Sequence, residues 1–379
     1  MVTVGSPGTY TRQAKYPNLG SIVGYTSYLY GQSGLEASLD PYLRGIKGNP
    51  ASMIWWYQLL YSQPPPGLDV RLSIDLHQQQ TADALLGNNR GALVLLNASS
   101  GEILAIASHP SFDPNQLEQN WTSLINDPNS PLLDRVTQGH YPIGSALGPF
   151  LLARANEKGA LPALPDSLSY PFNGNTWNCA IQPDSQITWG KAVSDGCPGA
   201  LAALGKQLNA ADFVNLYHDL GLDQTPDLPI PVANASSIPS MSKLDEAAIG
   251  QLPLSVSPLQ MALAAASLSA KGSRPAPKLA ISVHTPNQGW VILPASSPNT
   301  IFSASETQST VAQLASNGLP IWQIVATAQS QKNAITWYLA GTDQDWKGSP
   351  LALALVLEQD NPALAQKIGS TFLTSTAQP

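Results

Sequence analysis

Residues 91–108 read Gly91-Ala-Leu-Val-Leu-Leu-Asn-Ala-Ser-Ser-Gly-Glu-Ile-Leu-Ala-Ile-Ala-Ser108. Two apolar runs, 91–96 and 102–108, are separated by a short run of turn-forming residues. Apolar runs of this length, bounded by Asn, Ser and Gly, are typical of β-strands joined by a tight connection. The stretch therefore predicts a β-hairpin.

Further strands are expected on both sides of this hairpin, far apart in the sequence. Before it, residues 69–75 alternate as a strand and residues 78–86 follow as a helix. After it, residues 146–270 are rich in helix patterns, which are clearest at 200–208 and 258–268. The chain then returns to strands and ends on a helix, with segments expected at 322–329, 334–340, 351–358 and 362–373. Strands at both ends of a helical middle predict one sheet assembled from distant segments, with a helical subdomain beside it.

Pro64-Pro65-Pro66-Gly67 is expected to connect two parts of the chain, because consecutive prolines form a stiff, extended linker. The predicted domains are an N-terminal segment, residues 1–66, and a main domain, residues 67–379. Within the first, a short helix is expected to start at Ser33-Gly-Leu-Glu36. Trp55-Trp56-Tyr57 begins an apolar stretch that runs to Tyr61. We expect this stretch to be a helix packed against the main domain, and the alternative is a surface that faces a partner.

The composition excludes several classes of function. The 379 residues carry a net charge of −7, only 11% are charged, and no block of basic residues occurs, so a nucleic-acid-binding surface is not expected. There is no run of about 18 apolar residues, so no transmembrane helix is expected, and any membrane anchor is expected upstream of Met1. The five histidines show no metal-ligand spacing, and neither a metal nor another cofactor is expected.

Four stretches together resemble class B penicillin-binding proteins, which cross-link peptidoglycan. They are residues 91–115, 127–150, 250–262, and 327–329 with 336–341. The resemblance implies an α+β fold of the serine penicillin-recognising type, with an antiparallel sheet of about five strands and a helical subdomain. It also implies that residues 67–379 are the transpeptidase-like domain, and that residues 1–66 are a remnant of the non-catalytic linker or pedestal domain.

The first motif of that family is a nucleophilic serine followed three positions later by a lysine. The two side chains share one helix face, so the amine can take the proton of the hydroxyl. In this chain Tyr141-Pro-Ile-Gly144 leads into Ser145 as the family requires, but Gly148 occupies the lysine position. Because the base is missing, we expect Ser145 to serve as a helix N-cap rather than as a nucleophile.

The other two family motifs are also degenerate. The Ser-x-Asn motif matches Gly196-Cys197-Pro198 or, with a two-residue slip, Ser194-Asp195-Gly196, and the asparagine is absent in both alignments. The Lys-Thr-Gly motif of the edge strand matches Ile324-Val325-Ala326, followed by the retained Thr327-Ala328-Gln329. An isoleucine cannot pair with the carboxylate of a peptide substrate as a lysine does.

Three degenerate motifs predict a catalytically inactive homologue of the serine D,D-transpeptidases. Loss of a general base alone typically costs about 10²–10⁴-fold in rate. The expected role is that of a scaffold or regulator for cell-wall synthesis or division proteins, on the extracytoplasmic face of a bacterial membrane, with weak or absent binding of peptidoglycan peptides and β-lactams. Two alternatives stay open: an active transpeptidase or carboxypeptidase with an unusual base such as Asp195, and a module that holds a muropeptide in the old cleft beside Thr327 and Gln329.

The sequence contains three weaker signals. In an extracytoplasmic protein Cys179 and Cys197 could form a disulfide, and the alternative is two buried thiols. Ser240-Met-Ser-Lys243 matches the pattern Ser-x-x-Lys literally, but it lies in a loop rich in Pro and Ser and is interpreted as solvated. His140 is interpreted as a loop histidine rather than as a substitute base.

Overall fold

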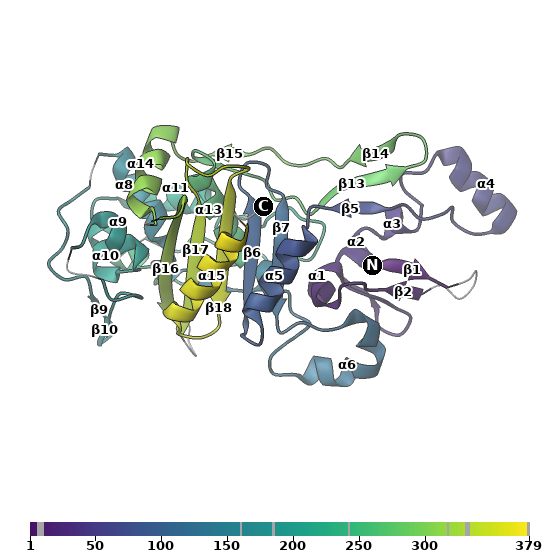
Figure 1. Ribbon diagram of the computed structural model, residues 1–379, viewed down its shortest axis with the longest axis horizontal. Helices are drawn as coiled ribbons and strands as arrows, with labels where there is room; N and C mark the ends of the chain where they lie inside the picture. The colour runs from purple at the N-terminus through teal and green to yellow at the C-terminus, as the bar shows by residue number, and fades with distance from the viewer. Residues whose placement is uncertain are drawn as a thin grey trace.

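A five-stranded antiparallel sheet lies at the centre of the molecule (Figure 1), with the strand order β16-β17-β18-β6-β7. The computed structural model describes residues 1–5, 11–159, 161–183, 186–241, 243–316, 318–329 and 334–376. The strands are β6 (Gly91–Asn97), β7 (Ile103–His109), β16 (Ile321–Gln329), β17 (Ala334–Thr342) and β18 (Leu351–Leu357). The predicted α+β fold with a sheet of about five strands is confirmed, and so is the hairpin at 91–108, which is β6 and β7.

The middle of the sheet joins segments that are far apart in the sequence. β6 pairs with β18 along its whole length, from Gly91 opposite Leu357 to Asn97 opposite Leu351. β16 pairs only with β17, so it forms one edge of the sheet. This edge strand carries residues 324–329, which the sequence assigned to the third motif.

Both faces of the sheet are covered by helices, which explains why its strands are apolar on both sides. On one face Leu93 and Leu95 pack with α5 (Leu76–Leu86) and α15 (Pro362–Thr376). On the other, Val94 and Leu96 belong to the larger core that contains the buried helix α13 (Pro258–Ser269). In Figure 1, α15 and α5 lie in front of the sheet and α13 lies behind it.

A helical subdomain lies beside the edge strand β16, on the left of Figure 1. Its helices are α8 (Gly148–Glu157), α9 (Trp189–Ser194), α10 (Pro198–Gly205), α11 (Ala210–Asp219), α12 (Leu244–Ala248) and α14 (Ala304–Leu314). Short strand pairs are β8 (Tyr141–Pro142) with β11 (Ser255–Val256), β9 (Tyr170–Phe172) with β10 (Asn175–Trp177), and β12 (Ser273–Arg274) with β15 (Asn299–Thr300). Two further short helices, α7 (Arg135–Gln138) and η3 (Gly144–Leu147), precede α8 in the chain. The helices η2 (Pro114–Gln116) and α6 (Leu117–Asn126) lie instead beside the N-terminal residues, below α1 in Figure 1, where Trp121 stacks on Tyr30.

The N-terminal residues form small elements at the opposite end of the molecule. They are β1 (Val2–Val4), β2 (Thr11–Gln13), η1 (Pro17–Leu19), α1 (Gly20–Val23), β3 (Thr26–Ser27), β4 (Gly31–Gln32), α2 (Gly34–Ser38), α3 (Asp40–Leu43) and α4 (Ala51–Tyr61). Beyond the proline run, β5 (Val70–Leu72) joins β13 (Ala280–Thr285) and β14 (Gly289–Ile292) in a three-stranded sheet. The domain boundary at residues 64–67 stays a prediction.

Helix α4 differs from the expectation in one respect. The apolar stretch 51–61 is a helix, but the expected packing is only partial: Met53, Ile54 and Tyr57 are half-buried, and its other residues are exposed. Ser62 adopts a left-handed conformation (φ 51°) directly after the helix, and the chain turns back through the proline run, which leaves α4 projecting at one end of the molecule (Figure 1). In the described part of the chain, no helix has both the length and the apolar character needed to cross a membrane.

Candidate active site

Ser145 lies in η3, a short 3-10 turn that is pressed against the edge strand β16. The turn can approach closely because Gly144 has no side chain. A Cβ at Gly144 would lie 2.3 Å from the carbonyl oxygen of Thr327, and the backbone there is left-handed (φ 57°). The N–H of Gly144 donates to the carbonyl of Gly250 at 3.3 Å, so the 250–262 stretch holds the turn from the other side.

The hydroxyl of Ser145 is bound to the backbone of β16. Its Oγ donates to the carbonyl oxygen of Thr327 and accepts from the N–H of the same residue, each at 3.2 Å. The side chain is only 4% exposed. Within the described residues these are the hydrogen-bond partners that the hydroxyl has, and neither is a base.

The expectation that Ser145 caps a helix is wrong. Ser145 lies inside η3, whose N-cap is Ile143, and Leu147 occupies the N-cap position of the following helix α8. A capping serine accepts from a backbone N–H two or three residues further along its own helix. Here the close approach of β16 offers the hydroxyl both a donor and an acceptor on another element.

Gly148, at the lysine position of the first motif, is surrounded by apolar side chains. It is the first residue of α8, and a Cβ built on it would lie 3.0 Å from Val193 of α9 and 3.0 Å from Leu201 of α10. A lysine at this position would have to displace both side chains. The lysine that acts as the base in the resembled family is therefore replaced here by Gly148. The side chains of Val193 and Leu201 fill the space that its side chain would occupy.

The second motif lies directly against Ser145. Gly196 has a left-handed backbone (φ 64°), and a Cβ on it would lie 3.1 Å from Ser145 Oγ and 2.5 Å from the carbonyl oxygen of Val325. Gly196 belongs to both possible alignments of the second motif, and Ser194 is the last residue of helix α9. Cys197 and Pro198 begin helix α10. The helical subdomain and β16 thus meet at Gly196, closer than a side chain would allow.

The residues at the third motif are buried in the core. Ile324, Val325 and Ala326 are each at most 1% exposed, and successive residues point to opposite faces of the sheet. Ile324 and Ala326 belong to the main core, and Val325 to the core beneath α5 and α15. No charged group of this motif is left to attract a substrate carboxylate.

Asp195, the residue considered as an unusual base, is buried beside this junction. Its Oδ1 accepts from Lys191 Nζ at 2.9 Å, and its carbonyl accepts from the N–H of Ile181. The lysine is one helical turn earlier on α9 and is partly exposed. The ion pair with Lys191 therefore stabilises the C-terminal end of α9.

Cys179 and Cys197 are joined by a disulfide in the structure. The bond connects the segment after β10 to the first turn of α10, next to Gly196. It links the wall of a neighbouring cleft to the second motif. Because the two sulfurs are bonded, the alternative of two buried thiols is wrong.

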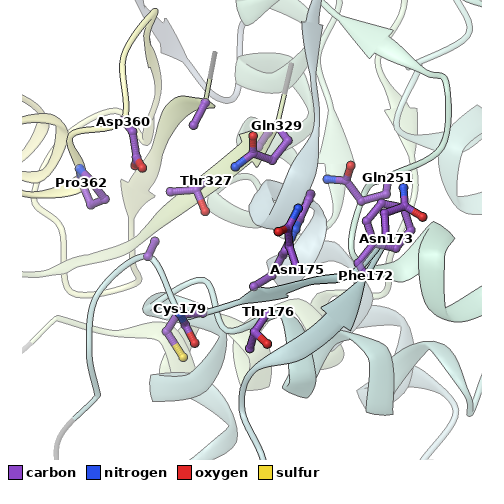
Figure 2. A pocket seen from close by; sticks show the side chains of 15 residues that line it. Phe172, Asn173, Asn175, Thr176, Cys179, Gln251, Thr327, Gln329, Asp360 and Pro362 are labelled. Atoms are coloured by element: carbon purple, nitrogen blue, oxygen red, sulfur yellow. The ribbon is translucent and has the colours of Figure 1, made fainter. Parts of the chain in front are cut away.

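A cleft of about 960 Å³ opens beyond Thr327, next to the sealed motif (Figure 2). Thr327 and Gln329 lie between Asp360 on one side and Asn173 and Gln251 on the other. Ser145 is not among the described residues that line it. The full lining is Phe172, Asn173, Asn175, Thr176, Trp177, Asn178, Cys179, Ala180, Gln251, Thr327, Ala328, Gln329, Ala334, Asp360 and Pro362. In the described lining, polar side chains are mostly amides and hydroxyls, and the one charged group is a carboxylate.

Sequence reasoning identified Thr327 and Gln329 as cleft residues, and Cys179 only as a disulfide candidate, but missed the other polar residues of this cleft. The turn Asn173-Gly174 was an available signal, because Asn-Gly is the commonest sequence in a tight hairpin, and both residues have positive φ in the turn between β9 and β10. Gln251 follows Gly250 in a stretch that already carried the resemblance. Asp360 gave no local signal.

A partly buried ion-pair cluster fixes the segment that leads into Ser145. Glu358 Oε1 accepts from Arg135 Nε at 2.8 Å and from the hydroxyl of Tyr141 at 2.9 Å, while Arg90 pairs with Oε2 at 2.6 Å. Burial favours protonation of Glu358, but Arg135, Tyr141 and Arg90 together outweigh burial and hold the pKa of Glu358 below its ordinary value. This anchor keeps Tyr141 in place, and Trp337 Nε1 donates to the carbonyl of Pro142 at 2.9 Å.

The other sequence signals have ordinary structural roles. His140 is exposed, and its Nδ1 lies 3.4 Å from Ser255 Oγ. The Ser240–Lys243 pattern includes Ser242, which lies outside the described residues, and Lys243 pairs with Glu246 of α12 at 2.5 Å.

The chain is similar to known proteins in sequence and in fold. The family model described as "Penicillin binding protein transpeptidase domain" matches residues 91–348. The chain is 30% identical over 318 residues to peptidoglycan D,D-transpeptidase PbpA of Mycolicibacterium smegmatis, which covers 75% of this chain and 63% of the relative. It is 33% identical over 157 residues to peptidoglycan D,D-transpeptidase MrdA of Escherichia coli, covering 38% of this chain and 24% of that relative.

Solved structures resemble the whole chain. Penicillin-binding protein A from M. tuberculosis, as its imipenem acyl-enzyme complex, superposes with a TM-score of 0.85 at 24% identity, over 99% of this chain and 95% of that chain. Pseudomonas aeruginosa PBP2 in complex with WCK 5153 superposes with a TM-score of 0.76 at 19% identity, over 96% and 90%. At these identities the structures show a shared fold. Against the curated PbpA relative, the aligned region spans under two thirds of the relative's length.

Proposed function

Because this chain belongs to the family of penicillin-binding protein transpeptidase domains, we propose that it serves peptidoglycan synthesis as a catalytically inactive member of that family. Its role in this proposal is that of a scaffold or regulator for cell-wall synthesis or division proteins, on the extracytoplasmic face of the bacterial membrane. The named relatives are peptidoglycan D,D-transpeptidases, which supports the assignment to cell-wall synthesis.

The closed junction around Ser145 is the observation that carries the proposal. A serine nucleophile needs a base within hydrogen-bond reach and room for a carbonyl carbon beside its oxygen. The described partners of Ser145 Oγ are backbone groups of Thr327, and Val193 and Leu201 fill the space next to Gly148. Gly196 lies against the hydroxyl on the remaining side. Among the described residues, the absence of a base and the lack of room beside the hydroxyl both support an inactive site.

Labelling with a fluorescent penicillin tests this proposal. We expect no covalent adduct under conditions that label an active transpeptidase of the same family in parallel, and no difference between the wild type and Ser145→Ala. We expect Gly148→Lys to remain unlabelled too, because the added side chain meets Val193 and Leu201 instead of the hydroxyl. An adduct on the wild type that disappears in Ser145→Ala would overturn the proposal.

The cleft beyond Thr327 favours a second candidate, a module that holds a muropeptide without reacting with it. Its amide and hydroxyl side chains could hydrogen-bond an uncharged part of such a ligand. Titration of peptidoglycan fragments by calorimetry separates the two candidates, because the scaffold predicts no heat of binding. If heat is observed, Gln251→Ala and Asn175→Ala should reduce it.

An active enzyme with Asp195 as its base makes a different prediction. It requires turnover of a D-Ala-D-Ala peptide or thioester that both Ser145→Ala and Asp195→Asn abolish. The pairing of Asp195 with Lys191 favours a structural role for this carboxylate, so we expect no turnover in either variant or in the wild type.

A further inference from the structure

Each edge of the central sheet is bound by one polar side chain. In the strand order β16-β17-β18-β6-β7, the edge strands are β16 and β7. An edge strand presents backbone N–H and C=O groups that no neighbouring strand satisfies, and folded proteins cover such edges. In this chain Ser145 binds the outer edge of β16, and Gln79 binds the outer edge of β7.

Ser145 binds both backbone groups of a single residue of β16. Its Oγ accepts from the N–H of Thr327 and donates to the carbonyl oxygen of the same residue, each at 3.2 Å. In an antiparallel strand the N–H and C=O of one residue point to the same side, and successive residues alternate between the two sides. Thr327 therefore faces away from β17, and the hydroxyl takes the place of a further strand.

Gln79 of α5 makes the equivalent contact at the opposite edge. Its side-chain oxygen accepts from the N–H of Ile106 at 2.7 Å, and its amide nitrogen donates to the carbonyl oxygen of Ile106 at 3.0 Å. A hydroxyl and an amide each offer a donor and an acceptor, which the two backbone groups of an outward-facing residue require. Gln79 belongs to none of the three motifs, so a contact of this kind needs no catalytic role.

The turn η3 lies against β16 too closely for a long side chain. A Cβ on Gly144 would lie 2.3 Å from the carbonyl oxygen of Thr327, and a Cβ on Gly196 would lie 3.1 Å from Ser145 Oγ. The carbonyl of Gly250 accepts from the N–H of Gly144 and holds the turn from its other side. A short hydroxyl fits this space and satisfies both groups of Thr327 where Ser145 is only 4% exposed.

We propose that Ser145 is an edge clasp, a side chain that substitutes for a neighbouring strand and thereby keeps the helical subdomain closed on β16. The first helix of the subdomain, α8, begins at Gly148, directly after this turn. Ser145 is a positioning residue in this proposal. The inference goes beyond the proposed function, because it assigns the retained serine a task that needs no base.

Hydrogen–deuterium exchange of the full chain, resolved at single amides by NMR, tests the edge clasp. We expect the N–H of Thr327 to be protected in the wild type. In Ser145→Ala it should exchange at least about tenfold faster, because a buried backbone group loses its partner. The amides of Ala326 and Ala328, which face β17, should change far less. This comparison within one strand separates opening of the edge from a general loss of stability.

The opposite edge supplies a reciprocal control. Gln79→Met keeps the length of the side chain and should release the N–H of Ile106 while Thr327 stays protected. Ser145→Ala should leave Ile106 protected. A thiol is a weak donor and a weak acceptor, so the exchange rate of Thr327 in Ser145→Cys should lie between those of the wild type and Ser145→Ala.

Ser108→Ala controls for the loss of a buried hydroxyl at another place. Ser108 is 1% exposed, and its Oγ also binds two backbone groups of another segment. It donates to the carbonyl of Leu133 at 3.1 Å and accepts from the N–H of Arg135 at 2.9 Å. In Ser108→Ala the exchange rate of Thr327, relative to that of Ala326, should equal the wild-type ratio.

The proposal is wrong if the N–H of Thr327 is unprotected in the wild type, or if Ser145→Ala leaves its exchange rate unchanged. It is also wrong if all amides of β16 accelerate together in that variant. Should Ser145→Ala fail to fold, the same comparison in Ser145→Cys decides. Penicillin labelling tests only the proposed inactivity, so the two proposals can fail separately.

Discussion

Asp134 is a buried carboxylic acid at the start of helix α7, on the route of the chain to Ser145. Its Oδ1 accepts from the N–H of Val136 at 2.9 Å, and the hydroxyl of Thr137 donates to Oδ2. Asp134 is thereby the N-cap residue of α7. Burial raises the pKa of Asp134 to about 6, because the hydrogen bonds from Thr137 and the backbone offset only part of the lost hydration.

Asp134→Asn should remove a pH dependence of stability. With the folded pKa above the unfolded value, the native state holds the proton more tightly, so the contribution of Asp134 to stability falls as pH rises from about 4 to about 6. An asparagine keeps the acceptor for Val136 and stays uncharged. Relative to the variant, the wild type should lose on the order of 3 kcal/mol in its free energy of unfolding between pH 4 and pH 7.

Urea unfolding at several pH values between 4 and 7 measures this difference. Asp127→Asn is the control, because it also alters a turn aspartate that accepts from a backbone N–H, but at a less buried position. Parallel pH profiles for Asp134→Asn and the wild type would contradict the expectation.

At the scale of elements, the junction between α10 and its neighbours depends on a covalent link. The disulfide joins Cys197, at the N-cap of α10, to Cys179 in the wall of the cleft. The same segment presents Gly196 to Ser145 and to the carbonyl of Val325. The bond therefore holds the β9–β10 region and the second motif against the edge strand β16.

Cys179→Ala/Cys197→Ala should lower the free energy of unfolding by about 3 kcal/mol. The loop closed by the bond has a sequence separation of 18, and in the chain-entropy account a loop of that size restricts the unfolded chain by about this amount. Thermal unfolding of the double variant, with the wild type in the presence and absence of reductant, provides the measurement. The reduced wild type should match the variant; equal melting temperatures in all three samples would show that the bond adds no stability.

At the scale of the whole molecule, a buried polar contact joins the N-terminal residues to the central sheet. The hydroxyl of Tyr16 donates to Asp83 Oδ2 of α5 at 2.6 Å, and Asp83 Oδ1 lies 2.8 Å from Nε2 of His109 at the end of β7. The other ring nitrogen of His109 lies 2.8 Å from the carbonyl of Gly87. Burial, and then the hydrogen bond to Asp83, raise the pKa of Tyr16 well above its usual range.

Tyr16→Phe should destabilise the protein by about 1–3 kcal/mol, because the buried Asp83 carboxylate loses a donor. Tyr30→Phe is a matched control from the same part of the chain, since it also removes a hydroxyl and keeps the ring that stacks on Trp121. Denaturant unfolding of both variants compares the two effects. Equal stabilities of Tyr16→Phe and Tyr30→Phe would show that the contact across the two parts of the chain contributes nothing measurable.

Much of the fold could be predicted from the sequence, because its signals are local. The apolar runs of β6 and β7 and the turn between them lie within a few residues of one another, and the late strands and final helix have equally clear patterns. The absence of a lysine at Gly148 and at Ile324 is also plain in the sequence. These residue identities and periodicities do not depend on what packs against them.

The tertiary structure alone decided how the remaining residues are used. The sequence predicted a helix cap at Ser145 and a packed helix at 51–61. The partner of Ser145 is instead a strand far along the chain, and in the described structure no residue of α4 is fully buried. The close contact between Gly196 and β16 likewise forms only when the two segments are folded against each other. The residue type determines what each side chain is able to bind. Its burial and its contacts depend on segments that are distant in sequence, so they cannot be predicted from a local sequence pattern.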